Sequence, residues 1–123
     1  MKRWLFYMYG VICYLLFFAT FVYLLGFVGN VLVPKSIDSS PSGSATTAVA
    51  IDLLLIAAFA LQHSIMARPA FKRVWTRIIP QPIERSTYVL ASCIVTGALI
   101  WGWQAVDMVI WDVQQPVARA VLW

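Results

Sequence analysis

The first long apolar run of the chain extends from Leu5 to Val33 and reads LFYMYGVICYLLFFATFVYLLGFVGNVLV. It contains no charged residue, and it is longer than the roughly 20 residues that an α-helix needs to cross the hydrocarbon core of a bilayer. Lys2 and Arg3 precede it, as they would in a secretory signal peptide. The run is nevertheless too long for a signal peptide's apolar region of about 7–15 residues. We therefore predict a retained membrane-spanning helix over residues 5–33.

The composition of the whole chain also indicates a membrane protein. Of its 123 residues, 62% are hydrophobic and 11% are charged, against roughly 45–50% and about 25% in soluble domains. A chain this short cannot bury the excess apolar surface, so that surface must face lipid. The net charge of +4 is spread along a hydrophobic chain with no extended basic stripe. We therefore expect a lipid bilayer as partner and no nucleic acid.

Two more apolar runs predict further spans over residues 48–66 and 86–104, with a polar loop before the first of them. From Pro116 to Trp123 the sequence is typical of the opening of a fourth helix, because proline is favoured in a first helical turn. The predicted fold is all-α and multi-pass, with three complete spans and the start of a fourth in a single membrane domain, residues 1–123. Since the fourth helix begins without finishing, we expect an incomplete N-terminal fragment.

Residues 67–82 differ in character from the runs around them. Apolar residues recur there at the spacing of one helical face: Phe71, Trp75, Ile78 and Ile79. Basic residues alternate with them: Arg68, Lys72, Arg73 and Arg77. A basic face opposite an apolar stripe is typical of a helix lying in the headgroup plane. We predict such an interfacial amphipathic helix between the second and third spans.

The basic residues also predict the orientation. Two lie at the N-terminus and five in the segment 67–86, whereas the loop after the first span and the stretch after the third have one each. The positive-inside rule then places the N-terminus in the cytoplasm. We expect a multi-pass protein of the bacterial inner membrane.

Polar groups within spans are costly and are therefore candidates for function. Gln62 and His63 end the second predicted span, and Glu84, Arg85 and Tyr88 open the third. An antiparallel pair of helices would bring both sets to the same depth, and arginines there could hold an anionic group. The alternative, a salt-bridged hairpin without a ligand, stays open at this point.

We single out His63 and Glu84 as candidate catalytic residues. The candidate substrate or cofactor contacts at the mouth of the two spans are Gln62, Arg68, Arg85 and Tyr88. Asp52 lies about three turns before His63, where a carboxylate near a helix start is favoured by the helix dipole. A lone histidine without a second ligand at suitable spacing is weak evidence for metal, so we predict no metal site and keep a haem- or metal-binding His63 only as a minor alternative.

The runs QHSIMARP (residues 62–69) and ERSTYV (residues 84–89) resemble the methanethiol S-methyltransferase family. The resemblance covers about residues 53–104 and extends to nurim and, more distantly, to isoprenylcysteine carboxyl methyltransferase. It implies S-adenosylmethionine-dependent methylation of a small thiol such as methanethiol, which gives dimethyl sulfide or a similar thioether.

In that family the cofactor is held mainly by a C-terminal half with an Arg-His-Pro motif. This sequence has no such motif, because its single histidine is His63. We therefore expect the 123-residue chain alone to be inactive. A non-catalytic, nurim-like membrane protein is the alternative, and the sequence leaves the oligomeric state open.

Overall fold

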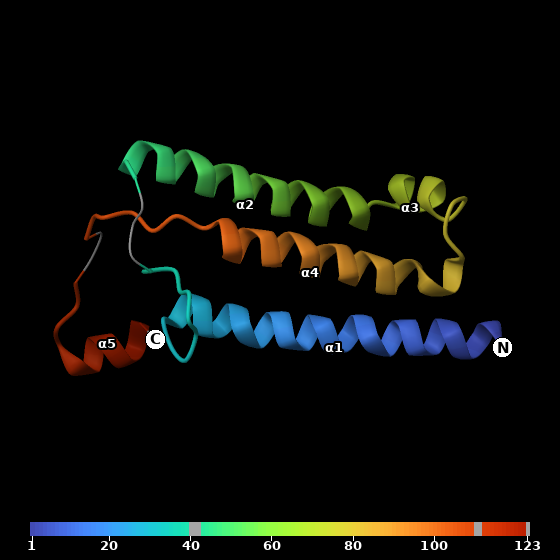
Figure 1. Cartoon of the computed structure of the whole chain (residues 1–123), viewed down its shortest axis with the longest axis horizontal. Coiled ribbons are helices and arrows are strands. Elements are labelled where there is room, and N and C mark those ends of the chain that lie inside the picture. Colours follow the sequence, from blue (N-terminus) through green and yellow to red (C-terminus); the bar gives the residue numbers. More distant parts are fainter. Residues whose placement is uncertain (40–42, 110–111, 123) are drawn as a thin grey trace.

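The computed structural model describes residues 1–39, 43–109 and 112–122, and these residues form helices and loops without a strand (Figure 1). The three long helices are α1 (Lys2–Gly29), α2 (Ala45–Ala67) and α4 (Glu84–Gly102). Three short elements are α3 (Pro69–Trp75), the 3-10 helix η1 (Gln81–Ile83) and α5 (Pro116–Leu122). The predicted all-α class is confirmed.

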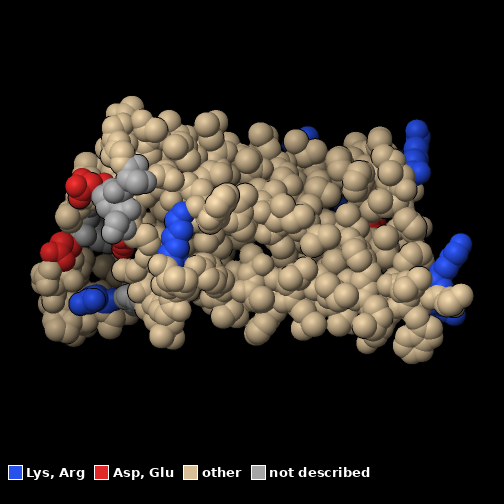
Figure 2. Space-filling view, viewed as in Figure 1, with Lys and Arg blue, Asp and Glu red and all other residues tan. Residues whose placement is uncertain are grey.

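Three helical segments are long and apolar enough to cross a membrane: Lys2–Gly29, Ala45–Ala67 and Gln81–Gly102, which joins η1 to α4. Only 6–17% of the residues in their most apolar windows are buried within the protein, so most of this surface needs lipid around it. On the face that Figure 2 shows, Lys, Arg, Asp and Glu lie mainly toward the two ends and the long middle is largely uncharged. The chain is an integral membrane protein.

Helix α4 lies between α1 and α2 and packs against both (Figure 1). It runs parallel to α1 and antiparallel to α2. Small and polar residues allow a close approach to α1: a Cβ atom on Gly10 would lie 3.4 Å from Ser86 Oγ, and Tyr9 Oη lies 3.1 Å from Thr87 Oγ1. Such contacts are typical of helix pairs in membranes, where apolar burial drives no association.

Helix α1 ends at Gly29, four residues before the end of the predicted span. Asn30 takes the left-handed conformation with φ 56° and ψ 41°, and its N–H reaches the carbonyl oxygens of Gly26 and Phe27. The N–H of Val31 also bonds to Gly26 O at 2.9 Å. This is how an αL cap satisfies the last carbonyls of a helix, so residues 31–33 leave the helix although they are apolar.

The other boundaries shift by a few residues as well. Helix α2 begins at Ala45, three residues earlier than predicted, because Ser44 Oγ accepts a hydrogen bond from the Thr47 N–H at 3.3 Å. Helix α4 begins at Glu84 and ends at Gly102, so Trp103 and Gln104 lie beyond it. Helix α5 covers Pro116–Leu122, and residue 123 of the predicted fourth span lies outside the described residues.

The segment after α2 is less regular than the predicted helix over 67–82. Helix α3 stops at Trp75, and turn-type bonds follow, from the N–H of Ile78 and of Ile79 to Trp75 O. Pro80 disfavours helical geometry at the residue before it. Only the first two apolar residues of the stripe, Phe71 and Trp75, share a helical face, with ring centroids 5.7 Å apart.

A hydrogen-bonded network closes the end of the bundle that lies away from the N-terminus. Asp52 is buried and its Oδ1 accepts the backbone N–H of Gln104 at 2.8 Å. The indole N–H of Trp103 donates to Ile37 O at 3.1 Å, and Lys35 Nζ donates to Trp101 O. Asp52 therefore fastens α2 to the end of α4 and lies apart from His63.

Candidate functional site

The antiparallel pair of α2 and α4 gathers four polar side chains at the end of the bundle that holds the N-terminus. Gln62 and His63 come from the last turns of α2, and Tyr88 and Ser92 lie four residues apart on α4. Residues at that spacing share one helical face. These four residues are named the α2–α4 polar cluster below.

His63 is oriented by two ring contacts, one from its own helix and one from α4. Phe59, one turn earlier, stacks on the imidazole with centroids 5.3 Å apart and an interplanar angle of 22°. The Tyr88 ring lies on α4, also 5.3 Å away and tilted by 47°. Tyr88 Oη donates to the His63 carbonyl oxygen at 3.3 Å, so the cross-helix contact fixes both ring and backbone.

Ser92 contacts each of the other three residues of the cluster. Its Oγ lies 3.4 Å from His63 Nδ1 and 3.4 Å from Gln62 Nε2. It also donates to the Tyr88 carbonyl oxygen, one turn back on its own helix, at 3.0 Å. One hydroxyl therefore joins both polar residues of α2 to α4.

Two buried polar atoms near this end have no hydrogen-bond partner among the described residues. One is Gln62 Oε1 and the other is Trp75 Nε1. Gln62 Nε2 is engaged with Ser92 and, at 3.2 Å, with Met66 Sδ. A buried unpaired carbonyl costs free energy in an apolar surrounding, so Gln62 Oε1 is an available acceptor beside His63.

Glu84 lies one turn before Tyr88 but bonds elsewhere. Its carboxylate lies 3.9 Å from Lys72 Nζ, and the Glu84 side chain is 16% exposed. Lys72 comes from α3, so this ion pair ties the short helix to the start of α4. The structure thus joins His63, Gln62 and Tyr88 in one cluster and places Glu84 at its edge, in contact with a lysine and not with the histidine.

The two arginines of the predicted mouth are both exposed. Arg68 joins α2 to α3, and Arg85 lies in the first turn of α4. Neither forms an ion pair with another described residue. Their guanidinium groups remain available to carboxylate or phosphate groups.

Ser92 could not readily be predicted as part of the site from the sequence. A single serine in an apolar helix is common, and serine often bonds to the carbonyl four residues back, as it does here. The available signal was the spacing of Glu84, Tyr88 and Ser92, which places polar groups at i, i+4 and i+8 on one face. Its contacts with α2 depend on the relative register of two helices, which no local pattern specifies.

The side chains of the cluster are hydrogen-bonding groups, and one of them is an imidazole. In the described part of the chain, no three His, Cys, Asp or Glu side chains lie close enough to hold a metal ion. A neutral imidazole can accept a proton near neutral pH, and it lies here beside a hydroxyl, a phenol and an amide. The arrangement suits a general base.

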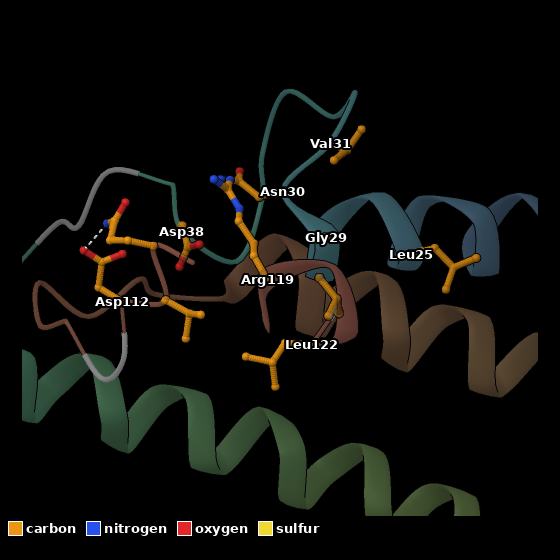
Figure 3. Close-up of a pocket in the computed structure, with 11 residues that line it drawn as sticks. Leu25, Gly29, Asn30, Val31, Asp38, Asp112, Arg119 and Leu122 are labelled. Carbon is orange, nitrogen blue, oxygen red and sulfur yellow. Dashed lines mark hydrogen bonds between the residues drawn. The ribbon is translucent and has the colours of Figure 1, made fainter. Parts of the chain in front are cut away.

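A separate hollow lies at the other end of the molecule. It has a volume of about 740 Å³ and lies between the end of α1 and α5. Figure 3 shows Asp38, Asp112 and Arg119 around it, with Leu25 and Leu122 among its apolar side chains. It contains no residue of the α2–α4 polar cluster, so the cluster and this hollow are separate features.

Fold and cluster define a class: a membrane-embedded protein of at least three spanning helices, with a histidine-centred polar cluster between two of them. Comparison with known proteins is more specific. A methanethiol S-methyltransferase of Mycobacterium tuberculosis is 48% identical over 123 residues, which is 100% of this chain and 50% of that protein. A protein of the same name from Crocosphaera subtropica is 47% identical over 116 residues, covering 94% of this chain and 46% of its own.

A third, from Pseudomonas deceptionensis, is 52% identical over 95 residues, which is 77% of this chain and 36% of that protein. No family model matches the chain, and no solved structure matches it significantly. The chain is therefore similar, over most or all of its length, to several proteins named methanethiol S-methyltransferase. It spans about half the length of the curated relatives it matches.

Proposed function

We propose that this chain is the N-terminal, membrane-embedded part of an S-adenosylmethionine-dependent methyltransferase that acts on a small thiol such as methanethiol. The product is dimethyl sulfide or a similar thioether. The observation that carries the proposal is the similarity, at 45–52% identity, to several proteins named methanethiol S-methyltransferase. The α2–α4 polar cluster supplies residues that suit the chemistry.

The described residues fit one end of the proposed cofactor. Its amino-acid end carries a carboxylate, for which the unpaired guanidinium groups of Arg68 and Arg85 are suitable partners, and an ammonium group, for which Glu84 is suitable. When bound, the sulfonium supplies a methyl group to a thiolate, and the electron pair of the broken carbon–sulfur bond stays on the departing sulfur. The rest of the cofactor is assigned to parts of the protein outside this chain.

His63 is assigned the role of accepting the thiol proton. Attack by sulfur is faster from the thiolate than from the thiol, and a general base within hydrogen-bond reach provides it. Gln62 Oε1, buried and without a partner among the described residues, is a second acceptor that can orient the incoming S–H group. Tyr88 holds the imidazole in place.

The same proposal includes an orientation. The N-terminus and α3 lie at one end of the bundle (Figure 1), and basic residues collect there, which favours the cytoplasmic side of a bacterial inner membrane. Helix α3, with Phe71 and Trp75 on one face and basic residues around them, is proposed to lie at the headgroup level. The α2–α4 polar cluster then lies at the cytoplasmic end of its two helices, on the side where S-adenosylmethionine is available.

Membranes containing the product of the complete gene provide the test. They are incubated with methanethiol and S-adenosylmethionine labelled in its methyl group, and the headspace is analysed for labelled dimethyl sulfide. We expect labelled product that depends on both substrates. Membranes that carry the protein but form no labelled thioether from methanethiol or another small thiol would refute the proposal and favour the non-catalytic, nurim-like alternative.

A further inference from the structure

Ser92 uses all of its hydrogen-bonding capacity within the α2–α4 polar cluster. A hydroxyl has one proton to donate and two lone pairs to accept with. The proton is committed to the Tyr88 carbonyl oxygen at 3.0 Å, because a carbonyl can only accept. One lone pair receives Gln62 Nε2, which can only donate, at 3.4 Å.

The remaining neighbour of Ser92 is His63 Nδ1, 3.4 Å from the same oxygen. Because the Ser92 proton points to Tyr88, the contact is a hydrogen bond only if Nδ1 carries a proton and donates it. In a neutral imidazole the other nitrogen, Nε2, must then be the bare acceptor. We infer that Ser92 is a positioning residue that holds His63 in its Nδ1-protonated tautomer and so leaves Nε2 open to accept a proton from a thiol.

The surroundings of the ring agree with this assignment. Nε2 has no hydrogen-bond partner within the described residues, and His63 is exposed. Phe59 and Tyr88 contact the ring and hold its plane. A 180° flip of the ring about the Cβ–Cγ bond would keep that plane, but it would move Nδ1 away from Ser92 Oγ and lose their contact. The tautomer follows from geometry alone, whereas the identity of the proton donor rests on the proposed function.

The proposed step is a proton transfer from the thiol to Nε2. The S–H bond of the thiol breaks, its electron pair stays on sulfur, and the proton forms a bond to Nε2. The resulting imidazolium still donates from Nδ1 to Ser92 Oγ, so no other hydrogen bond in the cluster has to change. Without the serine, Nδ1 and Nε2 compete for the single proton, and a fraction of the protein carries a protonated Nε2 that cannot act as a base.

The tautomer can be measured without any assay of activity. His63 is the single histidine of the chain, so ¹⁵N labelling of histidine gives one unambiguous pair of ring signals. The full chain in detergent micelles is recorded at alkaline pH, where a free imidazole is neutral. We expect a protonated-type signal for Nδ1 and an unprotonated-type signal for Nε2.

Three variants make the result specific. Ser92→Ala should move the spectrum toward the Nε2-protonated tautomer. Ser92→Thr, which keeps a hydroxyl, should retain the wild-type pattern, and Ser64→Ala, beside His63 but without a hydrogen bond to it, should leave it unchanged. A wild-type spectrum with the proton on Nε2, or a Ser92→Ala spectrum identical to wild type, would overturn the inference.

An activity measurement separates this inference from the proposed function. In the complete protein, Ser92→Ala should lower kcat for methanethiol by roughly tenfold, less than the 10²–10⁴-fold that a general base contributes in full, and change KM little. Ser92→Thr should restore most of the rate. If the wild type has the predicted tautomer but no thiol methylation, the proposed function fails and the tautomer assignment stands; if Ser92→Ala changes the tautomer but not kcat, Ser92 has no positioning role in the reaction.

Discussion

Gly26 provides a sharp test of the packing at the end of α1. A Cβ atom at this position would lie 2.8 Å from the carbonyl oxygen of Val31 and 2.8 Å from Val33 Cγ1. The first of these atoms belongs to the backbone of the turn that caps the helix, so it cannot move aside without breaking the cap. Gly97 is the matched control, because a Cβ atom there would meet nothing within 4 Å apart from the adjacent residues and backbone of its own helix.

The expected loss of stability is the difference in the free energy of unfolding between the two variants. Alanine in place of a helical glycine gains up to about 1 kcal/mol from helix propensity, and this gain is common to both positions. Overpacking costs about 1–3 kcal/mol, and it applies only at the first position. Gly26→Ala should therefore be less stable than Gly97→Ala by about 1–3 kcal/mol.

The assay is equilibrium unfolding in mixed micelles, in which the fraction of the denaturing detergent is raised and helix content is followed by circular dichroism. Both variants must insert into membranes at wild-type levels for the comparison to hold. Equal stability of the two variants, or a more stable Gly26→Ala, would refute the placement of residues 31–33 against α1.

Three further results are expected. A reporter fused after Arg77 should be cytoplasmic and one fused at Gly43 should lie on the opposite side; the reverse assignment would contradict the proposed orientation. Lys72→Met should cost less than about 1 kcal/mol in the same unfolding assay, because the Lys72 side chain is 43% exposed and solvent-exposed ion pairs contribute little; a clearly larger loss would mean that the ion pair holds α3 in place. Replacing Phe71 and Trp75 with serine should expose α3 to added protease while the three long helices stay inserted, and unchanged protection would show that protein contacts, not lipid, hold the segment.

Most of the fold was predictable from hydropathy. A run such as Leu5–Val33 has no alternative to a helix in lipid, since every backbone polar group must be satisfied within the segment. The ends of the helices were less predictable, because they are set by local bonds that hydropathy does not register. The left-handed Asn30 ends α1 within an apolar run, and the short α3 ends before the apolar stripe does.

The candidate site was predictable only in part. Placing His63 and Tyr88 together needed nothing more than an antiparallel pair of helices of equal depth. The partner of Glu84 was not foreseen, because it comes from α3, whose direction after Arg68 no periodicity specifies. Ser92 was missed since its contacts span 29 and 30 residues along the chain and depend on the register between α2 and α4.

His63, within the α2–α4 polar cluster, is proposed to accept the proton of a thiol that is then methylated. The most direct measurement is the initial rate of dimethyl sulfide formation from methanethiol by the complete protein, compared between His63→Ala and its neighbour Ser64→Ala at equal membrane content. We predict that His63→Ala lowers kcat by roughly 10²-fold or more, in the range of a lost general base, and that Ser64→Ala keeps the wild-type rate. A His63→Ala protein that forms dimethyl sulfide as fast as Ser64→Ala would contradict the proposed role of His63 as the base.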